Sequence, residues 1–175
     1  LLGNVGNTFS KEVESIGKDE DIVLELSSFQ LETLHNFHSH ISVILNIAED
    51  HLDRYNNIED YFNAKKNITK NQDCNDFFIL NYDNYYTNRY YNELRKDSLF
   101  NVLTFSTKCK EANLYYNSED ECLYYNGEKL FSIAKRQLLG MHNIENILAS
   151  VLACLKDNIP VEYIDKAVNS FKSIE

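Results

Sequence analysis

The sequence predicts an α/β fold in which a mostly parallel sheet is flanked by helices and carries a small antiparallel meander. Three observations support this prediction. Short apolar runs end abruptly in polar residues, which is typical of parallel strands covered on both faces. These runs alternate with helical patterns, as they do in parallel α/β sheets. A tyrosine-rich stretch surrounds Asn126-Gly127, a strong signal for a hairpin turn.

The first half of the chain contains three predicted strands, each followed by a helical pattern. The apolar run Ile22-Val23-Leu24 indicates a buried strand, and a polar loop over residues 50–57 follows the second strand. The tyrosines of the third helix do not disrupt its helical pattern. The expected strands cover residues 22–26, 42–47 and 77–81, and the expected helices cover about 28–34, 58–70 and 85–94.

The second half adds one strand, the meander and two helices. A strand is expected at residues 99–105 and the meander at 112–133. Helices should cover about 142–156 and 161–171, separated by the break Asn158-Ile159-Pro160. Because no repeat, low-complexity tract or Pro/Gly linker interrupts these patterns, we expect one domain over residues 1–175.

Composition excludes several classes of partner. The formal net charge of -10 and the pI near 4.9 argue against binding to nucleic acid or to an anionic membrane. They do not exclude a nucleotide, because a metal and a few local donors override the global field. The four cysteines have no CxxC spacing, which indicates reduced thiols. We expect a cytoplasmic monomer without a membrane span or signal peptide.

Polar side chains follow two of the predicted strands, where ligands bind in parallel sheets. Glu25 ends the first strand, and Asp50, His51 and Asp53 follow the second. Carboxylates and an imidazole meeting in one crevice suit a divalent metal, Mg²⁺ if phosphate is also bound. Two other interpretations remain open. Glu25 could be a helix N-terminal charge and His51 a solvated loop histidine.

Two further pairs of side chains share a helix face. Tyr61 and Lys65 are four residues apart, although Lys65 could be an ordinary surface lysine. Asn143 and Asn146 are three residues apart near a helix start, and their amides offer the donor and acceptor that an adenine edge requires. Asn143 could alternatively cap that helix.

Five motifs occur in the order found in the Mur ligase central domain, a P-loop NTPase-like domain. They are GNVG at residues 3–6, ELSSFQLE at 25–32, DHLDR at 50–54, YFNAK at 61–65 and GMHNIEN at 140–146. The chain resembles this family of ATP-dependent amide ligases of peptidoglycan synthesis over essentially its whole length. The form of residues 25–32 is most similar to the branch that joins D-glutamate to UDP-N-acetylmuramoyl-L-alanine through an acyl phosphate.

The resemblance implies cofactors and residue roles. ATP and Mg²⁺ are the implied cofactors, and the two implied substrates are UDP-N-acetylmuramoyl-L-alanine and D-glutamate. The implied metal ligands are Glu25, His51 and Lys65, with Lys65 carbamylated and acting with His51 in catalysis. The implied adenine contacts are Asn143 and Asn146. The implied contacts to the muramoyl substrate or the transferring phosphate are Asn4, Ser27 and Gln30. These last three could instead be turn or cap residues.

The family pattern extends beyond the ends of this sequence. Its Gly-rich GxxGK[ST] phosphate loop is expected before Leu1 and its C-terminal domain after Glu175. We therefore expect a truncated central domain that is inactive by itself. Two alternatives stay open at this point: a related folylpolyglutamate-type ligase, and a non-catalytic fragment that binds a nucleotide or a UDP-sugar.

Overall fold

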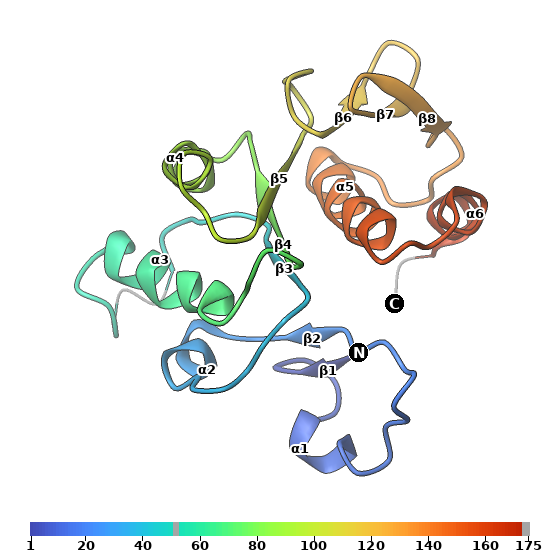
Figure 1. Cartoon of the computed structure of the whole chain (residues 1–175). Coiled ribbons are helices and arrows are strands. Elements are labelled where there is room, and N and C mark those ends of the chain that lie inside the picture. The colour runs from blue at the N-terminus through green and yellow to red at the C-terminus, as the bar shows by residue number, and fades with distance from the viewer. Residues whose placement is uncertain (51–52, 173–175) are drawn as a thin grey trace. The chain divides into compact units, whose positions relative to one another are not determined.

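A computed structural model describes residues 1–50 and 53–172 of the chain. The chain forms two compact units (Figure 1). The first unit combines Leu1–Phe37 with Glu49–Lys70, and the second combines His38–Ala48 with Asn71–Glu175. The chain crosses between the units at positions that carry neither proline nor glycine, which is why composition did not indicate a boundary there.

The second unit contains a six-stranded sheet whose strands are ordered as in the sequence. Its strands are β3 (Ile41–Ile44), β4 (Phe77–Asn81), β5 (Asn101–Ser106), β6 (Leu114–Asn117), β7 (Cys122–Tyr125) and β8 (Glu128–Ser132). β3 to β6 run parallel, and β6, β7 and β8 are antiparallel. The predicted fold class, a mostly parallel sheet with an antiparallel meander, is therefore confirmed.

The turn of the meander follows the predicted chemistry. Asn126 and Gly127 both have positive φ, at 49° and 86°, as a two-residue hairpin turn of the primed type requires. On the preceding pair of strands, Tyr115 and Tyr124 stack with ring centroids 5.1 Å apart. Such cross-strand aromatic pairs fix the register of a hairpin.

Helices α4 (Tyr85–Leu94) and α5 (Met141–Lys156) lie on opposite sides of β4 and β5 in Figure 1. Phe78 meets Tyr90 of α4 edge-on at 6.1 Å, whereas Ile79 packs in the buried cluster that includes Leu148 of α5. Successive side chains of a strand point to opposite faces, so both faces of β4 are buried. This arrangement explains the continuous apolar run of β4.

Helix α6 (Val161–Ser170) packs beside α5 and against β8. None of the helices in the part of the chain that the structure describes is long and apolar enough to cross a lipid bilayer.

Side chains tie together the loops that follow β3, β4 and β5. Asn84 donates its amide to the Ile47 carbonyl at 2.9 Å. Asp83 accepts hydrogen bonds from the Ser106 hydroxyl at 2.5 Å and from the Thr107 N–H at 2.7 Å. The carboxyl edge of this parallel sheet is therefore held by direct polar contacts.

The first unit is smaller and contains a two-stranded parallel sheet. Its elements are β1 (Leu2–Gly3), α1 (Phe9–Glu12), β2 (Leu24–Glu25), α2 (Ser28–Glu32), α3 (Ile58–Lys66) and a 3₁₀ turn (Asn67–Thr69). Helices α2 and α3 pack together. Tyr55 joins them, because its ring lies 6.1 Å from Phe29 and 5.5 Å from Tyr61.

Several predicted boundaries were wrong. The strand expected at residues 22–26 is only β2, and Ile22 and Val23 are 44% and 66% exposed rather than buried. Within the described residues β2 pairs with β1 alone, so no neighbouring strand extends the ladder over Ile22. The expected helix over residues 28–34 ends at Glu32.

Two strands of the second unit also differ from the prediction. β3 ends at Ile44, the last residue paired with β4, and Leu45 is 40% exposed. β5 begins at Asn101, whose N–H donates to the Asp76 carbonyl, so Leu99 precedes the ladder and is 79% exposed. In both cases the apolar run is longer than the register of the neighbouring strand allows.

Candidate functional site

Glu25 lies at the end of β2, where β1 brings Asn4 beside it. The Asn4 N–H donates to the Glu25 carbonyl at 2.8 Å, and the Asn4 amide lies 3.4 Å from Glu25 Oε1. Gly3 pairs with Glu25 and has a φ of +110°, and a Cβ on Gly3 would overlap the Glu25 carbonyl oxygen. A glycine at this position is therefore required for the approach of the two strands.

Lys65 lies on α3 in the same unit, half-buried above the ring of Tyr61 with 5.2 Å from Nζ to the centroid. Burial lowers the pKa of Lys65, and the nearby carboxylates of Asp50 and Glu25 partly oppose this shift. The net pKa is below the ordinary value for lysine. The structure thus brings Glu25, Asp50 and Lys65 within electrostatic reach of one another.

Burial also raises the pKa of Tyr61, and the negative charge of Asp50 adds to the shift. Tyr61 is therefore a neutral phenol at neutral pH. Its aromatic ring lies beside the Lys65 amine from one helical turn away.

Arg54 and Glu32 were not singled out by the sequence patterns. Arg54 Nη2 lies 2.7 Å from Glu32 Oε2, and its guanidinium lies 4.3 Å above the Phe29 ring. Tyr55 and Arg54 also lower the pKa of the Glu32 carboxyl through hydrogen bonds. These contacts anchor the segment after Asp53 to α2. Arg54 and Glu32 are 22 residues apart, so no local periodicity signals their contact.

Ser27 and Gln30 form a reciprocal cap at the start of α2. The Gln30 N–H donates to Ser27 Oγ at 3.3 Å, and the Ser27 N–H donates to Gln30 Oε1 at 2.9 Å. This is a capping box, the structural alternative that the sequence left open. It directs the chain from β2 into α2 immediately after Glu25.

Asn143 and Asn146 lie in the second unit, on the first turns of α5. Gly140, with a φ of 95°, occupies the N-cap, so the alternative in which Asn143 caps the helix is wrong. The Asn143 amide instead donates to the Leu139 carbonyl at 2.7 Å. Asn146 is exposed on the following turn.

His51 lies outside the described residues, as does Leu52. Its expected position beside Glu25 and Lys65 therefore stays a prediction. Asp50, the residue before it, belongs to the same compact unit as Glu25 and Lys65.

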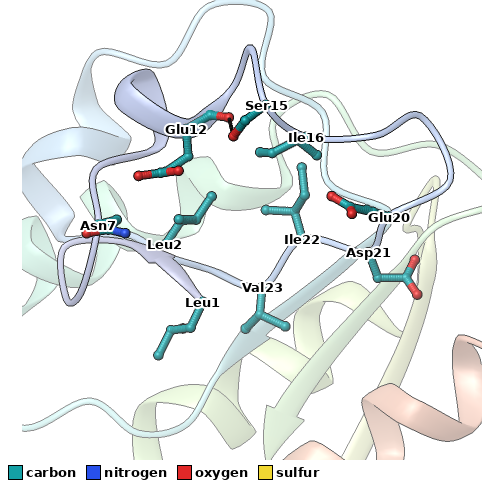
Figure 2. Close-up of a pocket in the computed structure, with 10 residues that line it drawn as sticks. All are labelled: Leu1, Leu2, Asn7, Glu12, Ser15, Ile16, Glu20, Asp21, Ile22 and Val23. Atoms are coloured by element: carbon teal, nitrogen blue, oxygen red, sulfur yellow. Dashed lines mark hydrogen bonds between the residues drawn. The ribbon is translucent and has the colours of Figure 1, made fainter.

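A cavity of about 280 Å³ opens beside β1 and β2 (Figure 2). Leu2, Ile22 and Val23 contribute apolar walls, and Glu12 and Glu20 contribute carboxylates. The ten residues that line it include no lysine or arginine and none of the candidate site residues. Its charge disfavours a phosphate, so this cavity does not fit a nucleotide.

The sequence matches the family model described as the Mur ligase middle domain over residues 7–154. Among curated proteins, it is 36% identical to a UDP-N-acetylmuramoylalanine–D-glutamate ligase of Clostridium tetani over 99% of this chain and 36% of that protein. The protein of the same name from Clostridium kluyveri is 38% identical, with the same coverage. The Staphylococcus aureus protein is 37% identical over 100% of this chain and 37% of its own length. The chain thus spans little more than a third of these relatives.

Solved structures share the fold. A UDP-N-acetylmuramoyl-L-alanyl-D-glutamate–2,6-diaminopimelate ligase superposes with a TM-score of 0.70 at 22% identity, over 87% of this chain and 32% of that one. MurF of Thermotoga maritima, solved in complex with ADP, superposes with a TM-score of 0.54 at 19% identity, over 77% and 31% of the two chains.

Proposed function

This chain belongs to the Mur ligase family, and we propose on that premise that it is the central part of a ligase that adds D-glutamate to UDP-N-acetylmuramoyl-L-alanine. The observation that carries the proposal is the convergence of Glu25, Asp50 and the half-buried Lys65 in one compact unit. The names of the relatives support the choice of acceptor and amino acid.

The proposed reaction has two steps. The free carboxylate of the acceptor attacks the γ-phosphorus of ATP, which gives an acyl phosphate and ADP. The amine of D-glutamate then attacks the acyl carbon, and the tetrahedral adduct expels inorganic phosphate to leave an amide. In such phosphoryl transfers a protein acts chiefly by positioning the reactants and neutralising charge.

Lys65 fits the role of a carbamylated lysine. The amine must be neutral to react with CO₂, and the partial burial of Lys65 favours the neutral form. The carbamate product is an anion with two oxygens. Together with Glu25 and His51 it would offer Mg²⁺ the hard ligands this ion prefers. Bound there, Mg²⁺ would supply charge neutralisation at the transferring phosphate.

The remaining roles follow from position and side-chain chemistry. Asn143 and Asn146 would hold the adenine, because their amides both donate and accept hydrogen bonds and Asn146 is exposed. Complex formation between ADP and the MurF relative supports a nucleotide site in this fold. Asn4, which touches Glu25, would orient the acceptor or the transferring phosphate. Ser27 and Gln30 would contribute through the cap that follows Glu25.

The proposal also predicts where the protein works. Its proposed substrates, ATP and a UDP-sugar that carries one amino acid, are cytoplasmic metabolites, so we place the enzyme in the cytoplasm.

The decisive experiment is a coupled assay on the full-length protein that carries this chain. We expect ADP and phosphate release that requires UDP-N-acetylmuramoyl-L-alanine, D-glutamate and Mg²⁺ together. A folate acceptor and L-glutamate serve as controls and should not support turnover. Turnover with the folate acceptor, or ATP binding without turnover on either acceptor, would overturn the proposal.

A further inference from the structure

A second cluster of potential metal ligands lies in the second unit, at the amino ends of β3 and β4. His38 and His40 precede β3, and Asp73 and Asp76 precede β4. This is the opposite end of these strands from the carboxyl edge, where parallel sheets bind their substrates. The cluster is therefore independent of the residues assigned to the ligase reaction.

Asp76 is the centre of the cluster. It is buried, at 3% exposed, yet both of its carboxylate oxygens face imidazoles. His38 Nε2 lies 2.5 Å from Oδ2, and His40 Nδ1 lies 3.2 Å from Oδ1. The Asp73 N–H also donates to Oδ2 at 2.7 Å. A buried carboxylate surrounded by two imidazoles and an N–H is a strongly oriented ligand.

Three of these residues offer ligand atoms that lie close together. One atom each of His38, Asp73 and Asp76 lies within 4.8 Å of the other two. Ligand atoms bonded to one metal at about 2.0–2.2 Å are separated by roughly 3.3–3.6 Å in a tetrahedral site. Only modest movement of the exposed His38 and Asp73 side chains is needed to reach that spacing.

We propose that His38, Asp73 and Asp76 form a binding site for a divalent transition metal of the Zn²⁺ type. An imidazole nitrogen with two carboxylates matches the ligand preference of Zn²⁺, whereas Mg²⁺ prefers oxygen alone and retains its waters. His40 would not bind the ion directly. It holds the second oxygen of Asp76, as the outer partners of metal-bound carboxylates commonly do.

Metal binding would replace a proton. The 2.5 Å separation between His38 and Asp76 fits a shared hydrogen bond and is too short for a bridging ion. The ion would enter as this hydrogen bond opens and the imidazole turns its lone pair toward the metal.

Titration calorimetry of the protein with ZnCl₂ tests the site. With millimolar Mg²⁺ present to occupy the proposed site at Glu25, His51 and Lys65, we expect one Zn²⁺ per chain. We expect His38→Ala to weaken its binding at least tenfold, because the loss of outer partners alone typically weakens metal sites about 10- to 100-fold. Asp73→Asn should have a similar effect. His40→Gln should weaken binding less than His38→Ala. Millimolar Mg²⁺ should not compete.

Two controls separate this site from adventitious binding. Cys74→Ser removes an exposed thiol from the same turn as Asp73, and His35→Ala removes a histidine three positions before His38 in the sequence that is not part of the cluster. Both variants should bind Zn²⁺ as the parent does. Circular dichroism checks that His38→Ala is folded, and the imidazole ¹⁵N shifts of His38 should change on Zn²⁺ addition to the parent. Unchanged Zn²⁺ affinity in His38→Ala and Asp73→Asn, or loss of binding in Cys74→Ser, would reduce the cluster to a hydrogen-bonded ion pair.

Discussion

Lys65 shows how opposing effects on a single residue prepare its chemistry. Burial disfavours the ammonium, while Asp50 and Glu25 favour it, and the balance leaves the pKa of Lys65 below its ordinary value. A fully exposed lysine would be almost entirely protonated at neutral pH and unreactive toward CO₂. Glu25 would then accompany the carbamate as a ligand of a cation. The site is therefore suited to a lysine that changes from cation to anion.

Replacing Lys65 by alanine tests this role. In the full-length protein, Lys65→Ala should lower kcat at least about 100-fold, because the carbamate that orients and neutralises the phosphate is lost. Added acetate should restore part of the activity by occupying the space of the missing carboxylate. Lys66→Ala is the matched control, since Lys66 lies on the neighbouring face above Phe62, and it should retain activity.

Carbon-13 NMR with labelled bicarbonate provides a readout that is independent of turnover. A carbamate signal should be present in the parent and in Lys66→Ala, and it should be absent in Lys65→Ala. Full activity of Lys65→Ala, or equal carbamate signals in all three proteins, would show that Lys65 is an ordinary helix lysine.

Gly3 gives a second prediction for a single residue. Gly3→Ala should separate β1 from β2, because the new Cβ would overlap the Glu25 carbonyl oxygen. Hydrogen exchange should then accelerate at the Asn4 N–H, which donates to that carbonyl. Gly127→Ala is the control: its φ is also positive, but no atom lies within 4 Å of the position that its new Cβ would take. It should lose only about 1–2 kcal/mol of stability from the left-handed backbone.

If Gly3→Ala and Gly127→Ala change the hydrogen-exchange rate of the Asn4 N–H equally, the close approach of β1 and β2 is not what positions Glu25. The comparison therefore separates steric contact from backbone strain.

Among the elements, the sequence predicts those whose ends are set by burial on both faces or by a local cap. β4 and α4 have the bounds expected from the pattern, because β4 is covered on both faces and α4 begins at the capping residue Asn84. β2 was overextended because an apolar run does not reveal how many neighbouring strands will pair with it. The hairpin at Asn126-Gly127 was predictable because these two residues readily adopt the positive φ of the turn. The ends of β3, by contrast, depend on its register with β4, a strand distant in the sequence.

Ser27, in the cap of α2, has two proposed roles that can be measured separately: capping the helix and contacting the substrate. Ser27→Ala should lower stability by about 1 kcal/mol, since it removes the acceptor for the Gln30 N–H. Ser27→Asp should keep that stability, because aspartate caps helices as well as serine does. If Ser27 also faces the acceptor or its phosphate, the added negative charge should raise the KM for UDP-N-acetylmuramoyl-L-alanine.

Thermal unfolding and steady-state kinetics of the two variants measure these effects. An unchanged KM in Ser27→Asp would leave Ser27 with the structural role alone. Equal stability of Ser27→Ala and the parent would contradict the capping box.

At the scale of the whole molecule, the candidate site could be predicted only in part. The spacing of Tyr61 and Lys65 and the strand ending at Glu25 are local features, and both are readable from the sequence. The approach of Lys65 to Glu25 depends on the packing of α2 and α3 and on the Arg54–Glu32 ion pair, which join distant segments. The division into two units was also hidden, because the chain crosses between them without a linker. Composition and periodicity describe segments, not the contacts between them.

The net charge and the buried Asp76 together give the molecule a predictable response to acid. With a formal net charge of -10, repulsion among carboxylates opposes folding at neutral pH, and partial protonation relieves it. Burial raises the pKa of Asp76, but hydrogen bonds from the Asp73 N–H, His38 and His40 outweigh this effect and lower it overall. Asp76 therefore stabilises the fold above its unfolded pKa, and that stabilisation is lost as the pH falls through its lower folded pKa.

We therefore expect the free energy of unfolding to rise from pH 7 to about pH 5. It should fall below about pH 4, where an aspartate in the unfolded chain binds a proton while Asp76 in the folded protein is still ionised. Urea unfolding at each pH measures it, and Asp76→Asn should flatten the acidic limb because it has no carboxyl to titrate. Salt should raise stability at pH 7, where repulsion dominates, because it screens exposed charges more strongly than the buried Asp76 contacts. His38→Gln is a milder variant that removes one partner of Asp76 and should flatten the same limb less. An acidic limb of equal slope in the parent, Asp76→Asn and His38→Gln would show that other carboxylates control acid unfolding and that the buried aspartate contributes nothing to it.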